Sequence, residues 1–154
     1  MFELNPDQSA SGVASVLVNR SAEEVFHFIG VDFFSNYPRW SPELQECELL
    51  TDPPLQLNSL IRQVRIDQGH RSETVFRVTV YDPGRKLVFE GVSDAFRCTY
   101  DICENPAAGQ TRLTFTVELL KLEFYMLPFA KIIRAAVRNG AKRTVQNLKY
   151  LLEK

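Results

Sequence analysis

The chain has 154 residues, 45% of them hydrophobic and 24% charged, and its formal net charge is −1. This length and composition are ordinary for a globular protein, and we expect a single domain over 1–154 that buries its core without metals or disulfides. No apolar run approaches the roughly 20 residues of a membrane span. The three cysteines, an odd number, argue against a disulfide framework and favour a reducing cytoplasm.

The N-terminal part of the sequence predicts a strand followed by a short helix. Residues 1–11 have neither the basic nor the apolar region of a signal peptide, and we expect them to form a loose leader. An apolar run over 13–18 predicts the first strand. Ser21 and Glu24 then have the spacing of a capping box, in which each side chain bonds a free amide of the first helical turn, so a helix is expected to begin here.

Six further apolar runs are separated by turn residues such as Asp82-Pro-Gly84. Their alternation of apolar and polar residues is typical of antiparallel strands, which we expect over 46–50, 60–67, 74–81, 87–92, 96–103 and 111–120. Because the turns are short, consecutive strands should pair, which predicts a meander of six or seven strands.

The last segment, 128–152, has the period of one long helix. Basic residues gather on one side of it, and an apolar stripe is expected on the other: Phe129, Ile133, Ala136, Val137, Gly140, Thr144, Leu148 and Leu151. The middle of this stripe (Ala136, Gly140, Thr144) is small. A helix that lies on a sheet with an under-filled middle predicts an internal cavity.

A sheet that buries one face needs a cover, and this chain offers a single long helix. We therefore predict an α+β fold in which a curved antiparallel sheet wraps around the C-terminal helix. Charged positions such as Arg65, Arg77 and Glu118 are expected to face water. Strand parity predicts the inward set: Val64, Ile66, Phe76, Val78, Val80, Phe96, Tyr100, Ile102, Leu113, Phe115 and Val117.

A second short helical or irregular stretch is expected over 33–40, ending near Pro38 and Pro42. It contains Trp40, the only tryptophan, and would close one end of the cavity. Trp40 could pack in the core or contact a ligand, and a lining residue does both.

Five segments together resemble START-like proteins of the SRPBCC superfamily, in the polyketide cyclase/dehydrase branch. The segments are VNRSAEEVF (18–26), YPRWSP (37–42), YDPGRKL (81–87), GQTRLT (109–114) and NLKYLLE (147–153). The resemblance spans nearly the whole chain and implies the helix-grip fold: a curved antiparallel sheet that grips the C-terminal helix, with two short helices after the first strand. It also implies a cavity for lipids, sterols, polyketides or other bulky apolar molecules. The family includes both enzymes and carriers, so the fold leaves the function open.

A smaller likeness concerns residues 36–41, which resemble the coenzyme Q-binding START-like proteins. Those proteins have a Tyr-Pro followed by an apolar segment that contains Trp and ends in Cys. Here Arg39 interrupts the apolar run, and Ser41 stands in the place of that Cys.

Metal and cofactor chemistry is not indicated by the sequence. His27 and His70 have no Cys, His or acid nearby at metal-ligand spacing, so we expect no metal. Cys98 and Cys103 differ by five residues and would point to opposite faces of one strand. There is no nucleophile elbow, phosphate-binding glycine loop or dinucleotide fingerprint, and we expect no cofactor.

Three polar residues stand in apolar strand contexts and are the candidates for catalysis. Arg62 shares the parity of Val64, Glu90 lies between two valines, and Tyr100 falls in the inward set. Arg62 and Glu90 could pair inside the fold, or one of them could meet the polar end of a ligand. The alternative is that both lie at strand ends with their charges in water.

Three functions remain open. The first is binding or transport of a lipid, polyketide, sterol or quinone-like molecule, with these contacts: Trp40, Val64, Phe76, Val78, Phe96, Tyr100, Phe115, Val117, Phe129, Ile133, Val137 and Gly140. The second is a cyclase or dehydratase that uses Glu90 with Tyr100 and Arg62.

The third function is an interaction module that uses the basic side of the last helix. From residue 121 onward, eight Lys and Arg stand against two acidic residues, whereas 1–120 hold ten against seventeen. The partner would be an anionic membrane or RNA, bound through Lys131, Arg134, Arg138 and Lys142, and no DNA is expected. A solvated helix face that complements an acidic body explains the same charges. The oligomeric state is left open.

Overall fold

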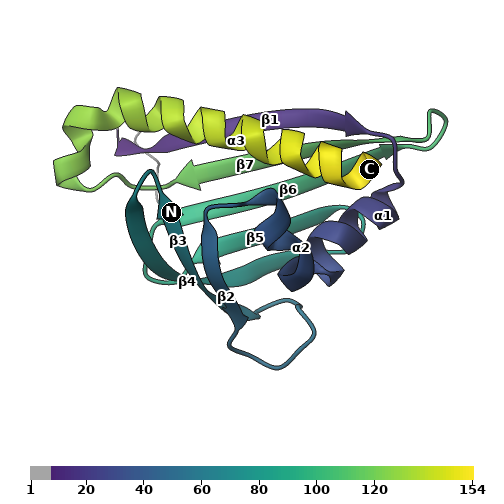
Figure 1. The fold of residues 1–154 in the computed structure, drawn as a ribbon, viewed down its shortest axis with the longest axis horizontal. Coiled ribbons are helices and arrows are strands. Elements are labelled where there is room, and N and C mark those ends of the chain that lie inside the picture. Colours follow the sequence, from purple (N-terminus) through teal and green to yellow (C-terminus); the bar gives the residue numbers. More distant parts are fainter. Residues whose placement is uncertain (1–7) are drawn as a thin grey trace.

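The structure, a computed structural model, describes residues 8–154, and seven strands form one antiparallel sheet in it (Figure 1). The strands are β1 (Ala10–Val18), β2 (Leu44–Leu49), β3 (Leu60–Asp67), β4 (His70–Asp82), β5 (Lys86–Gly91), β6 (Phe96–Asn105) and β7 (Gln110–Leu119). Their order in the sheet is β1-β7-β6-β5-β4-β3-β2, so the first strand pairs with the last. The expected helix-grip architecture is confirmed.

The N-terminal boundary differs from the prediction. Of the expected leader 1–11, residues 1–7 lie outside the described residues, and residues 10 and 11 already belong to β1. The strand starts early because Ala10 to Val18 pair without interruption with Leu119 to Thr111. Pairing with a neighbour, rather than apolar alternation, therefore sets the beginning of this strand.

The hairpin between β3 and β4 fixes the register of this part of the sheet. Gln68 and Gly69 both have positive φ, 51° and 81°, which is typical of a two-residue turn between antiparallel strands. Asp67 therefore pairs with His70, and β4 begins four residues before the predicted Thr74.

The short helices follow β1, as expected. They are α1 (Ala22–Phe26), a π-helical turn η2 (His27–Val31) and α2 (Phe33–Trp40). The capping box at α1 is confirmed: Ser21 Oγ accepts from the Glu24 amide at 3.1 Å, and the Ser21 amide donates to Glu24 Oε1 at 3.4 Å. The helix α2 runs through Pro38 and ends at Trp40, later than the first of the two predicted stops.

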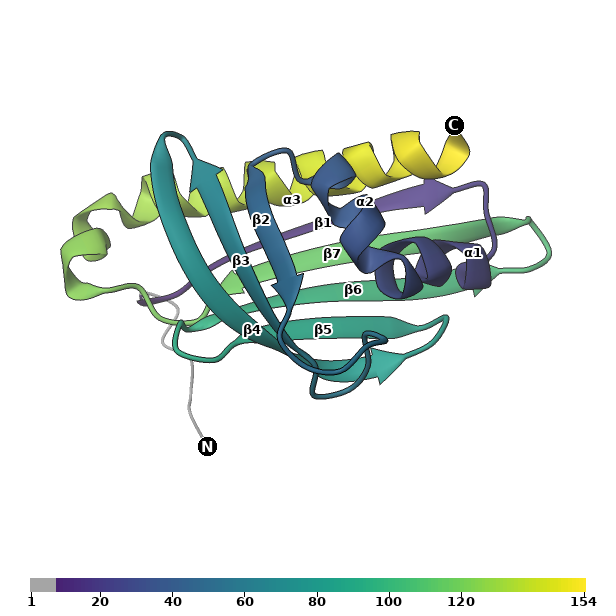
Figure 2. The same cartoon turned by 60° about the horizontal axis from the view of Figure 1, so that its bottom comes forward.

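The long helix α3 (Ala130–Glu153) follows a 3-10 turn, η3 (Phe124–Phe129), and lies mainly along β1 and β7 (Figures 1 and 2). Its backbone comes so close to β1 that a Cβ on Gly12 would lie 2.5 Å from the Val137 carbonyl oxygen. The buried side chains of α3 are Ala141, Val145, Leu148 and Leu152. No helix within residues 8–154 has the length and apolar character needed to cross a bilayer.

The predicted apolar stripe of α3 is therefore rotated relative to the observed one. Ala136 and Phe129 are exposed, whereas Ala141 and Val145, which the prediction left out, are buried. The reason is the contact with β1, because the helix turns toward that strand the face that contains Val137 and Ala141. The neighbouring face with Ile133, Gly140 and Thr144 is half-buried.

The sheet is strongly curved, and its hydrophobic core lies on its concave side. In Figure 2 the strands β2 and β3 bend away from the direction of β5, β6 and β7. The helices α1 and α2 lie over one end of this concave side, and α2 contacts α3 there. The concave side is therefore closed by short helices at one end and bordered by α3 along its length.

Candidate functional site

The concave face of the sheet presents a row of aromatic side chains toward α2 and α3. Cross-strand partners point to the same side of a sheet, and the pairs Val78 with Phe89, Leu87 with Tyr100, and Tyr100 with Phe115 place this row. The Tyr100 and Phe115 rings lie 4.8 Å apart. Six of the predicted lining residues belong to this face and to the core: Phe76, Val78, Phe96, Tyr100, Phe115 and Val117.

The helix α2 closes one end of the interior with aromatic rings. Phe33 and Trp40 are 1% and 2% exposed. The Phe33 ring lies 5.1 Å from that of Phe89, and the Trp40 ring lies 6.3 Å from that of Tyr100. The Asn147 amide donates to the Trp40 carbonyl oxygen at 3.1 Å, which ties α3 to α2. Trp40 thus packs in the core, and its contact with a ligand stays a prediction.

A chain of polar side chains runs along the interior side of β3, and we call Tyr37, Ser41, Gln63, Arg65 and Thr74 the interior polar cluster. Arg65 Nη1 donates to Tyr37 Oη at 3.0 Å and to Ser41 Oγ at 2.7 Å. Tyr37 Oη donates to Gln63 Oε1 at 2.7 Å, and Gln63 Nε2 donates to Thr74 Oγ1 at 3.2 Å. The carboxylate of Asp67 accepts from the other side of the guanidinium. The cluster places polar groups and a carboxylate-paired cation beside the aromatic core.

Burial moves the pKa values of the phenols and thiols of this interior further above neutral pH. It raises the pKa of Tyr37 to about 12, against the opposing charge of Arg65. It raises the pKa of the Cys98 thiol, which faces the same space, to about 12, and that of Cys47 likewise. The pKa of Tyr100 is also raised by burial. The phenols and thiols are therefore neutral donors. Burial lowers the pKa of Arg65, but its contacts with Tyr37 and Asp67 outweigh that effect and raise the pKa above its ordinary value.

We expect the protein to lose stability in alkaline solution for this reason. The pKa values of Tyr37 and Cys98 in the folded protein lie above the ordinary 10.0 and 9.0. As the pH rises, the unfolded chain releases these protons before the folded protein does. The contribution of the two groups to the free energy of unfolding is therefore complete below about pH 9 and is lost as the pH rises toward about 12. Urea denaturation at a series of pH values measures this, and Cys98→Ala should reduce the slope. A midpoint that stays constant above pH 9 would contradict the expectation.

The structure corrects the expected orientation of β3. Ile61 pairs with Phe76, so Ile61, Gln63 and Arg65 point inward, and Val64 points to the outer face with Arg62. Arg65 was expected to face water, and Val64 to line the cavity. Val64 is buried, but it does not belong to the group of contacting hydrophobic residues that forms the core on the concave side.

The candidate catalytic pair of Arg62 and Glu90 is not formed. Arg62 binds the carboxylates of Glu46, Glu48 and Glu73 on the outer face, the last at 2.6 Å. Glu90 lies 3.9 Å from Arg97. Of the three candidate catalytic residues, only Tyr100 faces the interior.

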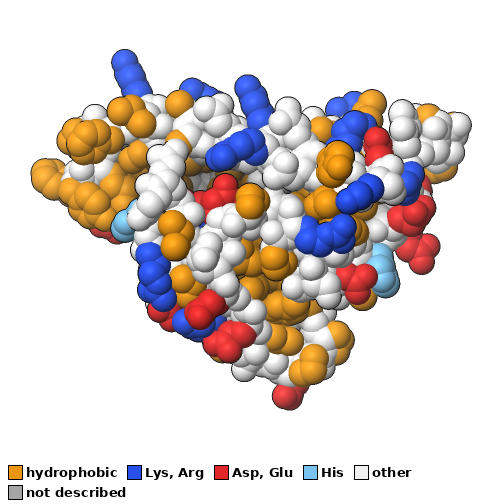
Figure 3. Space-filling model, viewed as in Figure 1, with side chains coloured by type: hydrophobic (Ala, Val, Ile, Leu, Met, Phe, Trp, Pro, Cys, Tyr) orange, Lys and Arg blue, Asp and Glu red, His pale blue; other side chains and the backbone are white. Residues whose placement is uncertain are grey.

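The predicted contacts on α3 divide into two groups. Phe129, just before α3, is 58% exposed, because the chain there extends beyond the strands (Figure 1). Ile133, Val137 and Gly140 are half-buried. A Cβ on Gly140 would meet nothing within 4 Å, so open space borders this residue. Figure 3 shows the surface hollowed between α3 and the tip of the β3–β4 hairpin.

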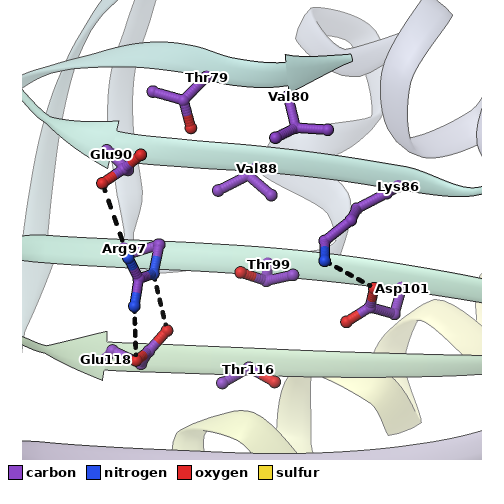
Figure 4. A pocket seen from close by; sticks show the side chains of 10 residues that line it. All are labelled: Thr79, Val80, Lys86, Val88, Glu90, Arg97, Thr99, Asp101, Thr116 and Glu118. Carbon is purple, nitrogen blue, oxygen red and sulfur yellow. Dashed lines mark hydrogen bonds and ion pairs between the residues drawn. The ribbon is translucent and has the colours of Figure 1, made fainter. Parts of the chain in front are cut away.

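Two further hollows of the described surface lie outside the interior. One, of about 480 Å³, lies on the face of the sheet turned away from α3 (Figure 4). Its charges pair with each other, since Arg97 makes two bonds to Glu118, at 2.9 and 3.0 Å, and Lys86 lies 3.5 Å from Asp101. The other, of about 400 Å³, lies between α1 and the end of α3. Neither includes the predicted lining residues of the concave face.

The histidines lie apart from this interior. His27 Nε2 lies 3.1 Å from Asp32 at the surface, and His70 is exposed in the β3–β4 hairpin. Among residues 8–154, no three His, Cys, Asp or Glu side chains are grouped to hold a metal ion.

A family profile covers nearly the entire chain. The profile described as polyketide cyclase / dehydrase and lipid transport matches residues 9–153. The chain belongs to this family. The resemblance inferred from the sequence segments is thereby confirmed. No curated protein sequence matches the chain.

Solved structures show that this member of the polyketide cyclase / dehydrase and lipid transport family shares its fold with distant proteins. The protein TTHA0849 from Thermus thermophilus has a TM-score of 0.75 at 14% identity, with 92% of this chain and 96% of that chain covered. The Zhui aromatase/cyclase from Streptomyces sp. R1128 has a TM-score of 0.75 at 16% identity, with 94% of each chain covered. Ginseng major latex-like protein 151 from Panax ginseng has a TM-score of 0.66 at 11% identity, with 96% and 99% covered.

Proposed function

We propose that the protein binds a small hydrophobic molecule in the interior between the concave face of the sheet and α3. The observation that carries this proposal is the pairing of an aromatic inner face with the interior polar cluster on one side of it. Apolar walls with a few converging polar groups are the usual composition of a site for a small organic ligand. The family description, which includes lipid transport, is consistent with it.

The interior polar cluster would fix the orientation of the ligand. Arg65 and Tyr37 are hydrogen-bond donors at neutral pH, and the Tyr37 hydroxyl now donates to Gln63. An oxygen acceptor on the ligand, such as a carboxylate or a carbonyl, could replace Ser41 as the partner of Arg65 and Gln63 as the partner of Tyr37, whereas a purely hydrocarbon ligand could not. The expected ligand is therefore an apolar body with an oxygen at one end.

The positions of the candidate catalytic residues favour ligand binding over catalysis. A cyclase or dehydratase step needs an acid and a base that both reach the substrate. Glu90 and Arg62 are on the outer face of the sheet, and the buried phenols are poor bases because they hold their protons at neutral pH. A carrier requires no such pair.

The experiment compares Arg65→Met with Arg97→Met. 8-Anilinonaphthalene-1-sulfonate, which joins an apolar body to an anionic sulfonate, serves as the probe. Because a bond to a charged group contributes about 1.5–3 kcal/mol, Arg65→Met should weaken binding by about tenfold or more. Arg97 also pairs with carboxylates, but on the outer face, so its replacement should leave the affinity unchanged. Equal effects of the two variants would refute the proposal.

Native mass spectrometry of freshly purified protein supplies the second readout. A co-purified apolar molecule that carries an oxygen group, and that is lost in Arg65→Met, would identify the ligand class. A carrier role would be contradicted if the purified protein had only the mass of the chain itself and also did not bind 8-anilinonaphthalene-1-sulfonate.

A further inference from the structure

Large apolar side chains are exposed together where the chain passes from η3 into α3. Phe124 is 89% exposed, Tyr125 70%, Phe129 58% and Ile132 70%, and we call these four residues the apolar tip. Figure 3 shows an orange, hydrophobic surface at the left end of the molecule, where Figure 1 places η3 and the start of α3. Contiguous exposed apolar surface of this kind, with no cover from residues 8–154, is a usual mark of an interaction site.

The charge around the apolar tip is positive. Between residues 121 and 142 there are five Lys and Arg and one acidic residue, Glu123. Lys121, Lys131, Arg138 and Lys142 are exposed, and none of these four forms an ion pair within residues 8–154. This contrasts with Arg62, Arg65 and Arg97, whose charges the protein itself neutralises.

This combination of charges and apolar groups selects between the possible partners. A second copy that covered the apolar tip symmetrically would bring Lys121 and Lys131 of both copies together, and like charges oppose that contact. RNA would use the charges but would gain nothing from Ile132. The interface of an anionic bilayer accommodates both features, because aromatic and aliphatic side chains enter among the headgroups while Lys and Arg meet the phosphates.

We propose that the apolar tip docks the protein on anionic membranes, with Lys121 and Lys131 at the lipid headgroups. The hollow between α3 and the β3–β4 hairpin lies in the same half of the molecule as the apolar tip (Figures 1 and 3). This surface is separate from the interior polar cluster, so it does not depend on which ligand the interior binds.

Vesicle co-sedimentation of the full chain tests the proposal. The protein should bind phosphatidylcholine vesicles that contain roughly a third phosphatidylserine, and bind vesicles of phosphatidylcholine alone much more weakly. The double variant Phe124→Ala with Ile132→Ala should weaken binding by about tenfold or more, because it removes the apolar groups that enter the interface. Lys121→Glu with Lys131→Glu should weaken it by about tenfold.

Matched controls exclude general surface effects. Tyr150→Ala removes an aromatic side chain that is 68% exposed on the same helix but at its other end, and Arg85→Glu reverses an exposed charge on the β4–β5 hairpin. Both should bind vesicles as the wild type does. The four substitutions at the tip and its lysines fall on exposed residues, so circular dichroism should show an unchanged fold.

Three results would overturn the proposal. The first is a wild type that binds neither vesicle. The second is that the double variant Phe124→Ala with Ile132→Ala binds vesicles as tightly as the wild type, while the wild type also binds an RNA oligonucleotide. That result would assign the basic residues around the tip to RNA. The third is that the wild type binds no vesicles but is a dimer in sedimentation equilibrium, whereas the double variant is a monomer. That result would assign the apolar tip to contact with a second copy.

Discussion

Replacement of Gly12 by valine should lower the free energy of unfolding by about 3 kcal/mol, although valine is the better residue for a strand. A Cβ at this position would lie 2.5 Å from the Val137 carbonyl oxygen and 2.8 Å from the Arg138 Cα. Both are backbone atoms of α3, which cannot move aside as a flexible side chain can. The helix must therefore shift away from β1.

The cost of that shift falls on the buried half of α3. Ala141, Val145 and Leu148 are 0%, 2% and 0% exposed in the core beneath the helix. Movement of the helix would open gaps around them, and such gaps are expensive in a close-packed interior. Urea denaturation measures the loss, and Gly12→Ala should show most of it. A Gly12→Val protein as stable as the wild type would show that α3 is not held against β1 at this point.

Gly140→Ala is the matched control for that measurement. This glycine lies at a half-buried position of the same helix, but its added Cβ would meet nothing within 4 Å. Removal of a glycine from a helix interior stabilises it by up to about 1 kcal/mol. The two glycine variants should therefore change stability in opposite directions.

The elements of the fold could be predicted because each has a local cause. The capping box at Ser21 starts α1, and apolar alternation with short turns predicts six or seven strands, of which seven are observed. The five segments that resemble the START-like family predict that the sheet wraps around the last helix. These features depend on neighbours in sequence, which a single chain displays directly.

The apolar residues of β3 predict the wrong orientation for this strand, because it carries polar residues on its inner side. Val64 and Ile66 are the apolar pair, but Ile61, Gln63 and Arg65 point inward. The turn between β3 and β4 indicates the correct orientation. A two-residue turn at Gln68-Gly69 pairs Ile61 with Phe76, and Phe76 is one of the residues that strand parity places on the inner face. The pairing of strands therefore orients β3 better than its own composition does.

The rotation of α3 and the position of Val80 could not be found in this way. The helix is turned by its close approach to β1 at Gly12, a contact between residues far apart in sequence. Val80 pairs with Val88 on the outer face because a bulge between Val78 and Val80 shifts the register. Neither a bulge nor a helix–strand contact leaves a clear periodic trace in the sequence.

Leucine in place of Gly140 should abolish ligand binding while the fold remains intact. The space beside Gly140 is open, so the leucine side chain can enter it without displacing the protein, and helix propensity favours the change by about 0.8 kcal/mol. If that space belongs to the ligand, the affinity for 8-anilinonaphthalene-1-sulfonate should fall by at least about tenfold, because the added side chain occupies volume that the apolar body needs.

The decisive comparison is with Asn139→Leu, which adds the same side chain to the same turn at an exposed position. Asn139→Leu should bind the probe as the wild type does, and both variants should unfold at or above the wild-type urea midpoint. Wild-type affinity in Gly140→Leu would mean that the space beside this helix is not the ligand site, whereas Arg65→Met would still test the interior polar cluster. The two substitutions thus probe opposite ends of one ligand, its apolar body against α3 and its oxygen against β3, and only a shared loss of binding places both ends in the same site.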